Sequence, residues 1–147
     1  MTCRVGHANF SLQAKEAEAF AAEAADDSDT AVANLQEAVM IEDSIDDLPQ
    51  PPYPVIPASE LCGNLLLELN RPVEASTYFQ KALKRTPNRP KAIFGLARAA
   101  QELGDTETAE NRYHEFLTIW RGADPDRPEL GDGKEVPSRE VSSQIGP

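Results

Sequence analysis

The sequence predicts an all-α protein whose helix pairs stack into a right-handed α-α superhelix of about three pairs. Apolar residues make up 40% of the chain but aromatic residues only 6%, and alanine supplies much of the apolar share, which favours closely packed helices over sheets. Apolar side chains recur at helical spacing in successive segments separated by Pro, Gly, Asn or Asp. A set of small and apolar positions also recurs along the chain with the period of a helix-turn-helix unit.

The N-terminal third predicts one degenerate helix pair. We expect residues 1–11 to be flexible and residues 12–45 to form the pair, with an interruption at residues 26–30 where Ser28 or Asp29 caps the second helix. Five prolines lie in residues 46–57, and proline removes a backbone donor and clashes with the preceding helical turn. We therefore expect an extended, semi-rigid connector over residues 46–57.

Residues 58–123 predict two regular helix pairs, in residues 58–89 and 90–123. Pro72 suits the first turn of a helix, where its missing N–H costs nothing. Pro87 closes one pair, Pro90 opens the next, and Gly104 provides a left-handed residue at the end of a helix. Residues 124–147 are rich in Pro, Gly, Ser and charge, and predict a disordered tail.

The repeat identifies a candidate family. Six positions recur one repeat later with their size or apolarity largely kept: Cys62, Gly63, Leu66, Ala75, Phe79 and Ala82 correspond to Leu96, Ala97, Ala100, Ala109, Tyr113 and Phe116. Ala31, Leu35 and Ala38 precede Ala75, Phe79 and Ala82 by one repeat plus an insertion that coincides with the proline-rich segment. Gly63, Ala75, Phe79, Ala82 and Pro87 resemble the motif of the tetratricopeptide repeat. The run of residues 57–105 also resembles the C-terminal repeats of larger, poorly characterised bacterial proteins of this family.

The resemblance implies a fold and a class of function. Tetratricopeptide repeats stack as helix pairs, and the first helices of the pairs line a concave face that binds peptides or proteins. The last repeat departs from the motif at Phe116 and Arg121, where the family usually has alanine and proline. The first repeat keeps only Ala19, Ala31, Leu35 and Ala38. The resemblance therefore predicts a protein-binding scaffold with one irregular pair at each end.

The charge of the chain restricts its partners and its location. The net charge of -11 disfavours nucleic acid and anionic membranes, which require a basic surface. Eleven acidic residues lie in residues 1–57 with only Arg4 and Lys15 to oppose them, whereas residues 58–121 hold eight acids and nine bases. Cys3 and Cys62 are too isolated to predict a disulfide framework, and no apolar run suits a signal peptide or a membrane span. We expect a cytoplasmic protein.

Candidates for catalysis and metal binding are few. His7 and His114 have no nucleophile at a recognisable spacing, and Cys62 lies on a leucine-rich helical face that predicts an inert core thiol. The acidic runs at residues 26–29 and 43–47 lack the glycine and terminal glutamate of a calcium loop. We expect no enzyme activity, no cofactor and no metal site, and a deep polar pocket around His114 would favour an enzyme instead.

A binding surface is the leading functional prediction. Lys91, Phe94 and Arg98 share one face of a predicted helix, away from the packing face of Leu96, Ala97 and Ala100. Asn64 holds the corresponding place in the preceding repeat. Two cations, an amide and an aromatic ring suit a carboxylate or an acidic peptide, although solvated surface residues would give the same pattern.

The alternative is a structural or assembly role through the C-terminal face. Repeat arrays usually end in a polar capping helix, whereas here Phe116, Leu117 and Trp120 end the last pair. If these side chains are exposed, they would favour homo-oligomerisation or the docking of another domain.

Overall fold

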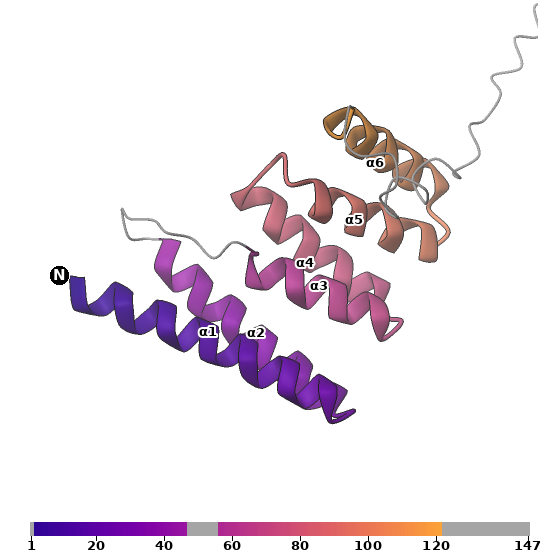
Figure 1. Ribbon diagram of the computed structural model, residues 1–147. Helices are drawn as coiled ribbons and strands as arrows, with labels where there is room; N and C mark the ends of the chain where they lie inside the picture. Colours follow the sequence, from indigo (N-terminus) through magenta and orange to yellow (C-terminus); the bar gives the residue numbers. More distant parts are fainter. Residues whose placement is uncertain (1, 47–55, 122–147) are drawn as a thin grey trace, which may run out of the picture.

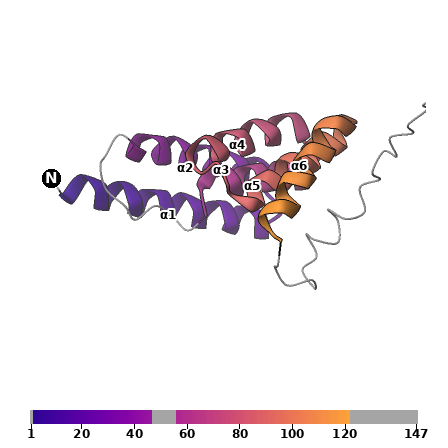
Figure 2. The same ribbon diagram turned by 90° about the horizontal axis from the view of Figure 1, so that it is seen from above.

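The computed structural model describes residues 2–46 and 56–121, and over these residues the chain forms six α-helices and no strand. The helices are α1 (Thr2–Ala24), α2 (Ser28–Asp46), α3 (Ala58–Glu68), α4 (Pro72–Arg85), α5 (Pro90–Glu102) and α6 (Thr106–Ile119). They form three antiparallel pairs stacked in chain order (Figure 1). Seen from above, α2 and α4 lie along one side of the stack and α1 along the opposite side (Figure 2). The expectation of an all-α helical repeat fold is confirmed.

The first helices of the three pairs end in the same way. The backbone N–H groups of Asp27, Arg71 and Asp105 donate to the carbonyls of Ala22, Leu66 and Ala100, each five residues back. The residue between helix and turn has a positive φ in each case: 59° at Asp26, 60° at Asn70 and 76° at Gly104. These are Schellman caps, and they recur along the chain in the same register as the core motif. The expected left-handed Gly104 is confirmed.

The second helices of the outer pairs also begin alike. The Asp105 carboxylate accepts a hydrogen bond from the Thr108 N–H at 3.1 Å, and the Asp27 carboxylate accepts one from the Thr30 N–H at 3.1 Å. Aspartate at this place satisfies a donor that the helix leaves unpaired. The cap of α2 is therefore Asp27, one residue before Ser28 and two before Asp29, the two caps that were expected.

The core follows the repeated positions. Phe79 is fully buried on α4, and its ring lies against both Gly63 on α3 and Gly95 on α5. A methyl group at Gly63 would come within 2.9 Å of the ring, and one at Gly95 would overlap it. Phe79 is thus the wedge that holds the middle pair against the last one.

The N-terminal segment differs from the expectation. Residues 1–11 were expected to be flexible, but α1 starts at Thr2. Ala8 packs against the core and Leu12 is only 1% exposed, so burial holds the helix from Ala8 onward. No proline interrupts residues 2–24, which lets the helix extend. The predicted connector at residues 46–57 and tail at residues 124–147 fall almost wholly outside the described residues.

Candidate interaction surface

Four residues were expected to line one binding face, and the structure places three of them on the surface of neighbouring helices. Asn64 on α3 and Lys91 and Arg98 on α5 are exposed, and α3 contacts α5 directly. We call these three side chains the α3–α5 face. Lys91 forms no ion pair with any described residue. Arg98 lies two turns from Lys91, and its one ion pair with a described residue is to Glu102, at 3.8 Å between the Arg98 Nη2 and the Glu102 Oε1.

Phe94 has a different surrounding from the one expected. Its ring centroid lies 5.8 Å from that of Tyr113 and 5.1 Å from that of Phe116, both on α6. Phe94 is half-buried, so one part of its ring packs inside the last pair and another part reaches the surface. The aromatic ring therefore holds α5 to α6 as well as bordering the α3–α5 face.

The C-terminal face is less exposed than the assembly hypothesis supposed. The assembly hypothesis required exposed apolar side chains at this end, but Phe116 is only 1% exposed, since it packs against Ile93, Phe94 and Trp120. The repeat motif usually has alanine at this position. The larger Phe116 side chain fills space against α5 and adds no exposed apolar surface. Leu117 and Trp120 are half-buried, and Ile119 is 40% exposed.

Sequence patterns missed two buried ion pairs between neighbouring helix pairs. Glu60, which is 1% exposed on α3, accepts hydrogen bonds from the guanidinium of Arg89, the N-cap of α5. Glu42, which is 3% exposed on α2, is 2.8 Å from the Arg85 Nη1 and accepts a bond from the Ala58 N–H at 3.2 Å. Burial raises the pKa of Glu42 despite the opposing effect of Arg85. Apolar periodicity carries no information about which charges meet across a boundary between pairs.

The Glu42 contact has a structural cause. The N-cap of α3 is Pro57, which has no side-chain oxygen to accept a bond from the first N–H groups. Glu42 reaches across from α2 and supplies that acceptor. A carboxylate at a helix N-terminus also interacts favourably with the helix dipole.

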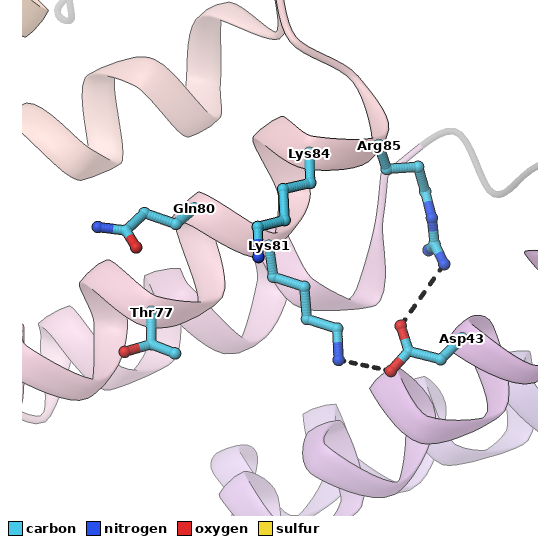
Figure 3. A pocket seen from close by; sticks show the side chains of 6 residues that line it. All are labelled: Asp43, Thr77, Gln80, Lys81, Lys84 and Arg85. Atoms are coloured by element: carbon cyan, nitrogen blue, oxygen red, sulfur yellow. Dashed lines mark hydrogen bonds and ion pairs between the residues drawn. The ribbon is translucent and has the colours of Figure 1, made fainter.

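A concave site lies between the end of α2 and α4. Its volume is about 470 Å³, and it is lined by Asp43, Thr77, Gln80, Lys81, Lys84 and Arg85 (Figure 3). Two of its three cations already have partners: the Lys81 Nζ is 2.5 Å from the Asp43 Oδ2, and Arg85 bridges Asp43 and Glu42. These ion pairs join α4 to α2, so the residues of this site hold the first two helix pairs together.

The residues considered for other chemistry are poorly suited to it. Burial raises the pKa of the Cys62 thiol to about 12, which keeps it protonated and unreactive at neutral pH. His114 is exposed on α6. Among residues 2–46 and 56–121, no group of three His, Cys, Asp or Glu side chains could hold a metal ion. None of the helices in this part of the chain is long and apolar enough to cross a membrane.

These features define a helical repeat protein, in which three stacked helix pairs each have a first helix that ends in a Schellman cap. The family follows from comparison: residues 66–117 match the model of the tetratricopeptide repeat. Residues 66–117 therefore match tetratricopeptide repeats, and the match begins inside α3, so the degenerate pair α1–α2 lies outside it.

The overall fold is similar to the crystal structure of PcrH from Pseudomonas aeruginosa. The TM-score is 0.65 at 18% sequence identity, and the match covers 85% of this chain and 87% of that chain. At this identity the likeness concerns the fold alone, and it extends over most of the described helices. No curated protein matches the sequence.

Proposed function

We propose that the protein is a non-catalytic interaction module that binds a peptide or protein with acidic character on the α3–α5 face. The observation that carries this proposal is the pair of exposed cations on α5. Lys91 has no ion pair among the described residues, and Arg98 has only a long one with Glu102. The remaining bases between Arg71 and Arg89 are mostly held by acids.

The neighbouring side chains would complete a polar contact with such a partner. Asn64, on the adjacent helix, offers an amide that can donate to a backbone carbonyl or a carboxylate. The exposed part of Phe94 offers apolar area between the two cations. Tetratricopeptide repeats provide a rigid scaffold for such a contact, since each pair is held by its neighbours.

The proposal predicts that reversing both charges abolishes binding. Peptides selected from a random phage-displayed library on the wild-type protein should be enriched in Asp and Glu. Their affinity, measured by fluorescence anisotropy, should fall at least tenfold on Lys91→Glu/Arg98→Glu, because repulsion replaces a charge-assisted contact.

The matched control is Lys84→Glu, a reversal at an exposed lysine of α4 that lies outside the α3–α5 face. It should change affinity by less than twofold. Equal losses in both variants would show only a general effect of net charge and would overturn the proposal. Selection of no peptide at all would favour the assembly role, which measurement of the mass in solution would then test.

A further inference from the structure

Glu16 on α1 has the same place in its pair that Glu60 has in the next pair. The two acids are separated along the sequence by the same interval as the Schellman residues Asp26 and Asn70. Glu60 is neutralised by Arg89, the residue that caps the start of the following first helix, α5. For Glu16 the following first helix is α3, and the N-cap of α3 is Pro57. The first pair therefore has the acid that corresponds to Glu60, but Pro57 takes the place of the arginine that corresponds to Arg89.

The described contacts of Glu16 agree with this missing cation. Its Oε1 is buried and accepts no hydrogen bond from any described residue. Burial raises the pKa of Glu16, and the nearby charge of Glu42 raises it further. The adjacent Lys15 does not compensate it, since its ammonium group is bound to Glu18 and Glu37, each at 2.9 Å. A desolvated carboxylate without a partner costs folding free energy, which a ligand cation would recover.

We propose that Glu16 binds a lysine or arginine side chain of the partner, so that the partner carries a basic group as well as the acidic group held by α5. The proposal rests on the function proposed above and adds a second point of recognition. A guanidinium from the partner would supply to Glu16 what Arg89 supplies to Glu60. Phe20, one turn further along α1 and 51% exposed, offers apolar contact to the arm of such a side chain.

The geometry also sets the spacing of the two groups. α1, α3 and α5 are the first helices of successive pairs in the stack. If the pairs follow one another at the spacing of packed helices, about 8–10 Å, two such steps separate α1 from α5. An extended chain advances about 3.3 Å per residue. The basic and acidic residues of the partner should then be separated by roughly five or six residues.

The test uses the same kind of random peptide library on the intact protein. Peptides selected on the wild type should contain Lys or Arg at the stated distance from Asp or Glu. A synthetic copy of the most enriched peptide should bind Glu16→Gln about tenfold more weakly, since it loses a buried charged contact. Replacing the peptide's basic residue by Ala should weaken binding to the wild type but not to Glu16→Gln.

The matched control is Glu18→Gln, which removes an exposed acid of α1 that is already paired with Lys15. It should change affinity by less than twofold. Pro57→Arg gives an independent measurement: an arginine supplied from within the chain should compete with the peptide and lower its affinity. Circular dichroism establishes that each variant is folded.

The outcomes separate this inference from the proposed function. Selected peptides that depend on Lys91 and Arg98, carry no enriched basic residue and bind Glu16→Gln as well as wild type would overturn the inference alone. Failure to select any peptide would overturn both. Loss of affinity in Glu16→Gln, with none in Glu18→Gln, supports the binding of a basic side chain of the partner by Glu16.

Discussion

At the scale of single residues, the fit of Phe79 into two glycines explains a position that the sequence motif left open. Gly63 matches the small residue of the repeat motif, but Gly95 has no such place in it. The structure shows why Gly95 is glycine: its missing side chain makes room for the Phe79 ring from the preceding helix. The helix therefore accepts a residue of low helix propensity in exchange for close packing between pairs.

We predict that Gly95→Ala lowers the free energy of unfolding by about 1–3 kcal/mol, the usual cost of inserting a methyl group into a filled core. Urea denaturation followed by circular dichroism measures this change. Phe79→Leu should relieve the overlap, so the double variant should lose less than the sum of the two single variants. A strictly additive result would show that the two side chains do not compete for space.

At the scale of the helices, the sequence predicts where most helices begin and end better than it predicts the contacts between helices. The recurrence of the core motif predicts the bounds of α3 to α6 because small and apolar residues must recur wherever helix pairs pack alike. It also predicts Gly104 at a helix end. Asn70 lies one repeat before Gly104, and Asp26 lies one repeat plus the insertion before Asn70. Counting back from Gly104 would therefore have located both of these caps.

The candidate surface was predicted only in part, for a physical reason. Helical spacing identifies Lys91 and Arg98 as one face, but it does not say how α6 lies against α5, so it missed the contacts of Phe94 with Tyr113 and Phe116. Charged residues follow no apolar period, and the buried ion pairs at Glu42 and Glu60 depend on three-dimensional placement. The start of α1 was missed because the burial of Ala8 and Leu12 is a tertiary contact.

The contact of Glu42 with the start of α3 leads to a prediction about how two helix pairs are joined. Glu42→Ala removes the acceptor for the Ala58 N–H and leaves the guanidinium of Arg85 without its buried partner. Breaking a buried pair by removing one member costs about 3–5 kcal/mol, so we expect a loss of that order in urea denaturation. The neighbouring Asp43→Ala, at a half-exposed carboxylate, should cost no more than about 1 kcal/mol. Similar losses in the two variants would contradict the assigned role of Glu42.

At the scale of the whole molecule, charge is divided along the stack. The N-terminal pair and the connector are acidic, whereas the two regular pairs hold eight acids and nine bases. The exposed cations of α5 lie in the second part, and Glu16, whose buried oxygen has no partner in the described part of the chain, lies in the first. A partner that spans both parts would meet opposite charges at its two ends, which would fix its orientation on the stack.

The same charges predict how stability depends on pH. Burial raises the pKa of Glu16 in the folded protein, so the folded state binds a proton more readily than the unfolded chain does. Its stabilising contribution is complete below the unfolded pKa of about 4.3 and is lost as the pH rises through the folded pKa. Asp27 and Asp105 act in the opposite sense, since hydrogen bonds from Thr30 and Thr108 lower their pKa. Their contribution is lost only as the pH falls through those lowered values.

We therefore expect Glu16 to add more to the free energy of unfolding at about pH 4.5, close to the unfolded pKa, than at about pH 7.5, where the net charge of -11 also adds repulsion. Urea denaturation at the two pH values measures the difference in wild type and in Glu16→Gln. The neutral glutamine cannot titrate, so its difference should be smaller, and the variant should be the more stable protein at the higher pH. The general effect of net charge is nearly the same in both proteins and cancels in the comparison. If the two proteins show equal differences, Glu16 is solvated in the free protein. Desolvation of its carboxylate could then not be the reason that Glu16 binds a cation.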